Sequence, residues 1–208
     1  MAIHPANIKN TFFRSFVFLA LFLPLMTCIF LPMFSPNQRV TEEEIKMVEN
    51  LNVNLQELTD KTNKTFFDLF ISSGLMSQSE EFFSNKSSGE EGVISNFAPR
   101  WIRGVWMIIY RAVWRFYALW IVFFIPVVAL CIPACIDGFA VRARKKYTFE
   151  SNNRIYFYTS MQTLMLMLGL LCFLPLAPIP LTSSLLVAMI LGMVFTVWTT
   201  TSNLQTGT

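Results

Sequence analysis

The sequence 116-FYALWIVFFIPVVALCIPACI-136 decides the fold, because none of its residues carries a charge. An apolar run of about 20 residues spans the roughly 30 Å hydrocarbon layer of a membrane as a helix. Inside lipid the backbone must satisfy its own hydrogen bonds, which favours a helix over an open strand. The basic stretch 137-DGFAVRARKKYTFESNNR-154 follows directly. Together the two stretches predict a transmembrane helix with a positively charged flank on one side.

The composition extends this prediction to the whole chain. Of the 208 residues, 54% are hydrophobic and only 14% are charged, a balance typical of a polytopic membrane protein. Three further apolar runs occupy residues 16–34, 155–174 and 181–199. We therefore expect an all-α membrane protein with four transmembrane helices, the first of them an uncleaved anchor.

The segments between these runs complete the expected organisation. Prolines at positions 175, 178 and 180 indicate a tight turn between the last two spans. The predicted order is a tail at 1–15, a first span at 16–34, an outer segment at 35–99 with an amphipathic helix at 41–71, an interfacial helix at 100–115, a second span at 116–136, a basic loop at 137–154, a third span at 155–174, a proline turn at 175–180, a fourth span at 181–199 and a tail at 200–208.

The outer segment begins with a helix-start signal. In Thr41-Glu42-Glu43-Glu44 the threonine and the last glutamate have the spacing of a capping box. Apolar residues then recur at steps of three and four as far as Leu69, with an expected break near residues 62–64. This amphipathic helix either binds a partner or another copy, or packs on the rest of the protein and the membrane surface. Residues 72–99 read as a loop with one short helix.

Residues 100–115 combine arginine with tryptophan. On a helix, Arg100, Arg103, Arg111 and Arg115 share one face, while Trp101 and several aliphatic residues share the other. This segregation indicates a helix that lies in the lipid headgroup layer and leads into the second span. The broad apolar face argues against a nucleic-acid surface, so no direct nucleic-acid binding is expected.

The fourth span carries a stripe of small residues at every fourth position, namely Ser184, Ala188, Gly192 and Thr196. Such a stripe lets two helices approach closely. It indicates a contact either with a neighbouring span of the same chain or with a second copy in a homo-oligomer.

The sequence contains none of the patterns that carry catalysis or metal binding. There is no glycine-rich phosphate loop and no Ser/His/Asp or Cys/His arrangement. The four cysteines all lie inside apolar runs, and the one histidine is His4. We expect no enzyme activity, no catalytic residue, no cofactor and no metal. Asp137, at the end of the second span, is expected to pair with Arg142 or Arg144.

The charge distribution predicts an orientation. Residues 35–99 hold eleven acidic and five basic residues, whereas the tail before the first span and the stretch 137–154 are basic. Lysine and arginine are retained on the cytoplasmic side, so we expect both termini and the basic loop in the cytoplasm of a bacterium. Arginines before the second span oppose this, but an outer segment of about 80 residues translocates largely regardless of charge.

A resemblance to a known family rests on the basic stretch and its flanks. Asp137-Gly138-Phe139 is followed by Arg142, Arg144-Lys145-Lys146-Tyr147, Ser151 and Tyr156. In this order and spacing, over residues 110–199, the chain resembles inner-membrane proteins of integrating conjugative elements and related plasmids, sometimes named TraJ-like transfer proteins. Phe139 stands where leucine is usual, and Tyr156-Phe157 lacks the histidine of a Tyr-His pair, so no role is carried over for that histidine.

The resemblance implies an accessory part in conjugative DNA transfer, beside a type IV secretion apparatus and its coupling ATPase. The residues expected to bind such partners are Asp137, Gly138, Arg142, Arg144, Lys145, Lys146 and Arg154. Membrane lipid is the other expected partner, since a short basic loop also attracts anionic headgroups and fixes topology. Two alternatives stay open: an exclusion or immunity protein of the recipient membrane, and a small transporter or channel, which the uncharged spans disfavour.

Overall fold

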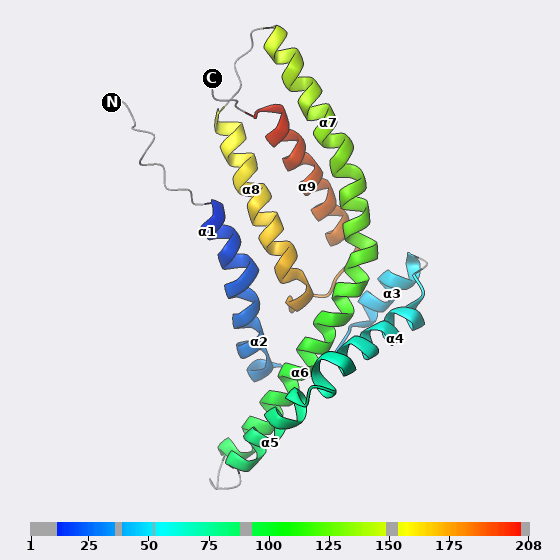
Figure 1. Ribbon diagram of the computed structural model, residues 1–208, viewed down its shortest axis with the longest axis vertical. Coiled ribbons are helices and arrows are strands. Elements are labelled where there is room, and N and C mark those ends of the chain that lie inside the picture. The colour runs from blue at the N-terminus through cyan, green and yellow to red at the C-terminus, as the bar shows by residue number, and fades with distance from the viewer. Residues whose placement is uncertain (1–11, 36–38, 52, 88–92, 149–153, 205–208) are drawn as a thin grey trace, which may run out of the picture. The chain divides into compact units, whose positions relative to one another are not determined.

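The computed structural model describes residues 12–35, 39–51, 53–87, 93–148 and 154–204. Within these residues the chain forms α-helices with short π and 3-10 segments and no strand, so the predicted all-α fold is confirmed (Figure 1). Four helices are long and apolar enough to cross a membrane, as predicted: Arg14–Phe34, Phe97–Tyr147, Ile155–Leu176 and Ser183–Ser202.

The chain divides into two compact units. One consists of Met1–Leu23, Ile125–Phe173 and Ser184–Thr208, and we call it the span unit. The other consists of Pro24–Phe124 and Leu174–Ser183, and we call it the outer unit because it contains the segment predicted to lie outside. Each unit is described by itself below.

Two of the long helices contain a π turn placed two residues before a proline. The π turn η2 (Phe18–Phe22) precedes Pro24 in α2 (Leu23–Phe34), and η4 (Trp120–Phe124) precedes Pro126. Proline has no N–H to donate, and its ring clashes with the carbonyl four residues earlier. A local widening to i→i+5 hydrogen bonds accommodates both defects, so the helices continue through their prolines.

In the outer unit, helices pack against the N-terminal part of a long helix. These helices are α3 (Glu42–Asn50), α4 (Leu55–Phe66), η3 (Phe67–Ile71) and α5 (Leu75–Ser87), and the long helix is α6 (Val93–Leu119). Figure 1 shows α4 and α5 lying along α6.

An aromatic cluster joins α4, η3 and α6. The ring of Phe66 lies 5.4 Å from that of Tyr110 and 6.2 Å from that of Trp106, both edge-on, and the Phe70 ring lies 5.5 Å from that of Trp106. The indole N–H of Trp106 is also hydrogen-bonded, since Nε1 donates to Ser79 Oγ at 3.0 Å. Edge-on aromatic packing stabilises a core beyond the area it buries.

The helices of the outer segment begin and end at different places from those expected. The chain breaks after Asn50, and Asn54 starts α4 by accepting the backbone N–H groups of Gln56 and Glu57. At the expected break α4 is regular, because the buried Thr62 hydroxyl donates to the carbonyl of Leu58 and needs no other partner. Residues 75–87, expected as mostly loop, form α5.

In the span unit, α1 (Phe12–Val17) and η2 pack along α8 (Arg154–Phe173), as Figure 1 shows. Gly169 allows this approach, since a Cβ there would lie 2.8 Å from the Cβ of Leu19. Gln162 Nε2 also donates to Ser15 Oγ at 3.0 Å. The first and third spans are therefore held together by close packing and an interhelical hydrogen bond.

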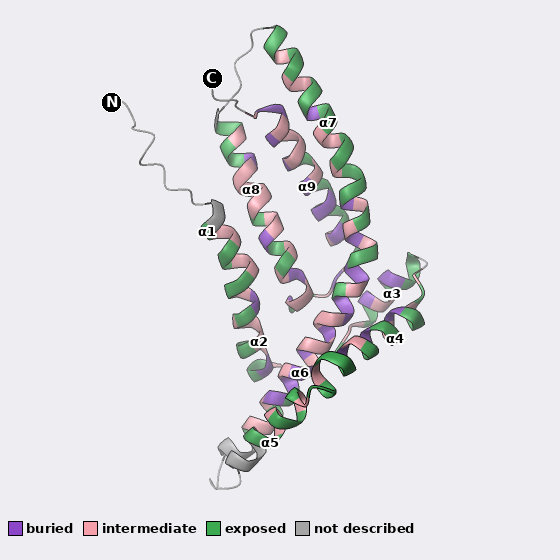
Figure 2. Ribbon diagram, in the orientation of Figure 1, coloured by how far each residue is buried: buried purple, intermediate pink, exposed green. Residues whose placement is uncertain are grey.

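The helix α9 (Ser183–Ser202) contacts both α8 and α7 (Ile125–Tyr147). It follows α8 after the short 3-10 turn η5 (Leu174–Leu176), and the Thr200 hydroxyl donates to Ser160 Oγ of α8 at 3.0 Å. Figure 2 shows that most residues of α7 are exposed, and many of these are large and apolar. An exposed apolar surface on a helix of this length suits contact with lipid.

Candidate functional site

The basic residues predicted to bind partners lie at the C-terminal end of α7. The sequence predicted a loop from residue 137, whereas the structure continues the helix to Tyr147. Ala140 and Ala143 favour the helix, and lysine and arginine in a last turn suit the negative end of the helix dipole. The cations therefore stand on a defined helical end and not on a loop.

The structure exposes these cations to different extents. Arg144 and Lys146 are exposed, whereas Arg142 and Lys145 are half-buried. Lys145 Nζ donates to Asn203 Oδ1, just beyond α9, at 3.2 Å. Arg154 is the first residue of α8, and its side chain lies outside the described residues.

Asp137 and Gly138 form the contact between α7 and α9. Trp198 Nε1 donates to Asp137 Oδ2 at 2.7 Å, a partner that the sequence did not suggest. A Cβ at Gly138 would lie 1.9 Å from Thr201 Oγ1 and 3.1 Å from the carbonyl oxygen of Trp198. Packing thus explains the Asp-Gly pair. Gly138 lets α9 approach α7, and Asp137 accepts the indole N–H of Trp198 on α9.

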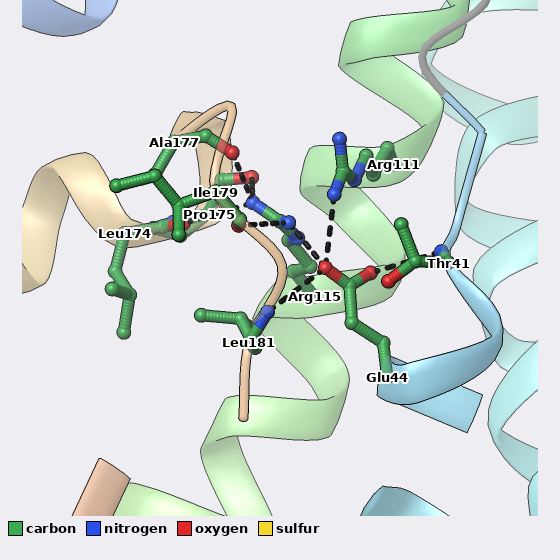
Figure 3. A network of polar contacts seen from close by, with 9 residues as sticks. All are labelled: Thr41, Glu44, Arg111, Arg115, Leu174, Pro175, Ala177, Ile179 and Leu181. Atoms are coloured by element: carbon green, nitrogen blue, oxygen red, sulfur yellow. Dashed lines mark hydrogen bonds and ion pairs between the residues drawn. The ribbon is translucent and has the colours of Figure 1, made fainter. Parts of the chain in front are cut away.

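A buried ion-pair cluster lies in the outer unit, shown in Figure 3. Glu44 of α3 is 0% exposed, and its Oε1 accepts Arg111 Nη2 of α6 at 2.9 Å and also Arg115 Nη2. The same oxygen accepts the backbone N–H of Leu181 at 3.1 Å. The other oxygen, Oε2, accepts the backbone N–H of Thr41 at 3.5 Å. We call these contacts the Glu44 cluster.

Arg115 uses its remaining donors to hold the turn between α8 and α9. Its Nη1 donates to the carbonyl oxygens of Leu174 (3.3 Å) and Ala177, and its Nη2 donates to that of Ile179 at 2.7 Å (Figure 3). The Leu174 carbonyl also accepts the Ala177 N–H at 3.2 Å, and an arginine presents its donors in a fixed fork that can reach several carbonyls of one turn. One guanidinium therefore fixes the proline-rich turn to α6.

Electrostatics keeps the carboxylate of this cluster ionised. Burial alone would raise the pKa of Glu44, but hydrogen bonds and charges from Arg115 and Arg111 outweigh burial and hold the pKa below its ordinary value. A buried carboxylate is stable only with such partners, and removing Glu44 would take away the carboxylate that the two guanidinium groups share.

The residues predicted to form a headgroup-facing surface lie in three different settings. Arg100 and Arg103 are exposed, whereas Arg111 and Arg115 are buried in the Glu44 cluster. Trp101 is half-buried and donates its indole N–H to the carbonyl oxygen of Ile29 at 2.9 Å. The arginine face of residues 100–115 is therefore divided: Arg111 and Arg115 pack inside the outer unit, and Arg100 and Arg103 stay exposed.

The ion-pair role of Glu44 was not predicted from the sequence, although two signals pointed to it. Arg111 and Arg115 are four residues apart beside an uncharged run, so both need a carboxylate or headgroup partner. The excess of acids at positions 42–44 provides one. Local patterns do not show which of the three glutamates turns inward.

A cavity of about 480 Å³ lies beside the aromatic cluster of the outer unit. Its lining includes Phe66, Trp106 and Tyr110 together with Arg39 and Arg103. The lining thus combines aromatic rings with arginines, and these residues come from α4, α6 and the segment before α3.

The small-residue stripe of α9 is divided between packed and exposed positions. Gly192 lies against Met167 of α8, and Thr196 is buried. Ser184 and Ala188 are exposed. The C-terminal half of the stripe, Gly192 and Thr196, is therefore the packed half, and Gly192 contacts a neighbouring span of the same chain.

All four cysteines are unpaired, and in the described part of the chain no three His, Cys, Asp or Glu side chains gather where a metal ion would bind.

Comparison with known proteins places the chain in a family. The family model of the IncC plasmid conjugative DNA transfer protein DtrJ-like matches residues 33–205, which confirms the resemblance to conjugative transfer proteins. Neither a curated protein nor a solved structure matches the chain. The match covers the anchor's end, the Glu44 cluster, the basic helix end and all later spans, so the chain belongs to the DtrJ-like family of conjugative DNA transfer proteins.

Proposed function

We propose that the chain is a non-enzymatic accessory component of conjugative DNA transfer in the bacterial inner membrane. It acts by contact with the type IV secretion apparatus and its coupling ATPase. The observation that carries this proposal is the cluster of cations at the end of α7, namely Arg142, Arg144, Lys145 and Lys146. Family membership supports the link to conjugative transfer.

The geometry of this helical end suits docking. A helix holds its side chains at fixed spacing, so partner contacts cost less ordering than they would on a loop. Arg144 and Lys146 are exposed, and both are available to acidic side chains of another protein. Complementary charge speeds encounter and selects partners more than it raises affinity. Attraction to anionic lipid is the competing role of the same charges.

The proposed topology places both termini and the end of α7 in the cytoplasm. The Glu44 cluster supports it, because Glu44 of α3 and Leu181 of the turn after α8 share a hydrogen bond. Such a contact requires α3 and that turn to lie on the same side of the membrane. A four-span topology puts them there, because α3 lies between spans one and two and the turn lies between spans three and four. The positive-inside rule then assigns that side to the periplasm.

The test is a charge reversal of the two exposed cations, Arg144→Glu with Lys146→Glu, in donor cells. We expect the transfer frequency to fall by about tenfold or more, as for charges that guide association. Membrane insertion should stay unchanged, because the charges at positions 142 and 145 still mark the cytoplasmic side.

The matched control is the exchange Arg144→Lys with Lys146→Arg, which keeps the charge and changes the shapes. It should transfer as the wild type does. Normal transfer by the charge-reversed protein, inserted at wild-type levels, would refute docking through this helix end. Expressing the reversed protein in donor or recipient alone separates a transfer role from recipient exclusion.

A further inference from the structure

A groove opens between α8 and α9 within the span unit, with a cavity volume of about 590 Å³. One end is lined by Met167 and Gly192, near the middle of the two spans. Its other end is lined by Lys145, Tyr156 and Asn203, at the end of the spans where the cations gather. The groove is therefore apolar at one end and cationic at the other.

The length of the groove matches one leaflet of a bilayer. The lining runs from residue 156 to 167 on α8 and from residue 192 on α9 to residue 203 just beyond it. At 1.5 Å per residue each stretch is about 16 Å long, or half of a hydrocarbon layer about 30 Å thick. The groove thus extends from the membrane surface to the middle of the bilayer.

The polar residues along the groove do not require a polar occupant. The hydroxyls of Thr163, Thr196 and Thr199 donate to carbonyl oxygens of their own helices at 2.8–2.9 Å. Because these donors are already satisfied, an alkyl chain could lie against them without leaving a hydrogen bond unmade.

The mouth of the groove suits an anion. Lys145 Nζ carries three N–H donors, and one of them bonds to Asn203 Oδ1. No acidic residue is among the described residues that line the groove. The exposed Arg144 on the same helical turn adds to the positive potential there.

We propose that this groove binds an anionic phospholipid of the leaflet that contacts the end of α7. One acyl chain lies between α8 and α9 as far as Gly192, and the phosphate lies at Lys145 and Tyr156. A free phosphate would occupy only the mouth and leave the apolar groove unfilled. The proposal does not depend on docking to secretion proteins, and its test measures lipid on the purified full chain.

The experiment is native mass spectrometry of detergent-purified protein with phosphatidylglycerol or phosphatidylcholine of identical acyl chains. The wild type should retain one phosphatidylglycerol and lose phosphatidylcholine at the same lipid concentration. Lys145→Ala should weaken retention by about tenfold, the value of one charge-assisted hydrogen bond, and Lys145→Arg should restore it. Inorganic phosphate in excess should not displace the lipid.

Two further variants make the result specific. Lys146→Ala removes the same charge one residue away, outside the groove lining, and should retain lipid as the wild type does. Gly192→Leu should fill the apolar end and prevent retention. A Cβ at position 192 meets the flexible end of Met167, 2.7 Å from its Cε, and that end can move aside.

Equal losses in the two lysine variants would overturn the site, because charge alone would then explain the binding. Retention of lipid by a folded Gly192→Leu protein, with wild-type helix content by circular dichroism, would also overturn it. Equal retention of the two lipids by the wild type would overturn the part assigned to Lys145.

Discussion

Replacing Glu44 by alanine should destabilise the outer unit more than any change at its exposed neighbours. The substitution removes a carboxylate that accepts from Arg111, Arg115 and the Leu181 N–H, and both arginines are almost fully buried. Breaking a buried ion pair by removing one partner costs about 3–5 kcal/mol, mostly the penalty of an uncompensated charge. At about 2–4 °C per kcal/mol for a chain of this size, the apparent Tm should fall by about 6–20 °C.

Two measurements on protein in detergent test this. Thermal unfolding followed by circular dichroism gives the shift in Tm, and hydrogen exchange gives a local readout at Leu181, whose N–H bonds to Glu44. In Glu44→Ala that amide should exchange faster. The matched control is Glu43→Ala, an exposed glutamate on the same turn of α3. If the two variants shift Tm equally, or protection at Leu181 is unchanged, the Glu44 cluster does not hold the turn.

Three other changes follow from the same contacts. Gly138→Val should separate α7 from α9 and lower the apparent Tm, whereas Ala140→Val on the exposed side of α7 should leave it within about 2 °C. Equal shifts would argue against that contact. Phe66→Ala should lower the free energy of unfolding by about 3–5 kcal/mol in denaturant, because Phe66 is only 8% exposed. Phe67 is 53% exposed, so Phe67→Ala should cost well under half of that. Similar costs for the two variants would contradict the aromatic core. Acidification tests the ion pair: since the pKa of Glu44 is lowered on folding, its stabilisation is present above its ordinary pKa of 4.5 and is lost as the pH falls through the lowered value. Glu44→Ala should therefore show a shallower acid loss of Tm than the wild type, and parallel curves would exclude this contribution.

The spans were predictable because the bilayer imposes a length and a composition on each helix. Charge-free runs such as 116–136 leave a helix as the only form that satisfies the backbone in lipid. Helix ends were harder to place. Gly138 and the basic residues after it suggested a loop, but glycine interrupts a helix only weakly when the contact with α9 needs a small residue there.

The sequence contains a signal for the break between α3 and α4, but the hydrophobic periodicity of residues 41–71 favoured one continuous helix. Apolar spacing continues across residues 51–54, so the pattern indicated one helix. Asn54, followed three residues later by Glu57, is a helix-start signal of equal weight, and the structure uses it. Local capping therefore decided the boundary over periodicity.

The Glu44 cluster could not be predicted from local patterns. Glu44 lies 71 residues from Arg115 in sequence, and Arg115 lies a further 59 residues from Leu174. Periodicity and composition indicate that each buried arginine of a helix requires a partner. They do not show which distant segment of the chain supplies that partner. That choice depends on tertiary packing.

The most direct test of the central claim, a four-span protein with the basic end of α7 in the cytoplasm, is thiol labelling of single cysteines. Lys146→Cys and Asn54→Cys, both at exposed positions, are made in a protein whose native cysteines are replaced by serine. A maleimide that cannot cross the inner membrane is added to spheroplasts before and after permeabilisation. Position 54 should react in intact spheroplasts, and position 146 should react only after permeabilisation. Labelling of position 146 in intact spheroplasts would contradict it.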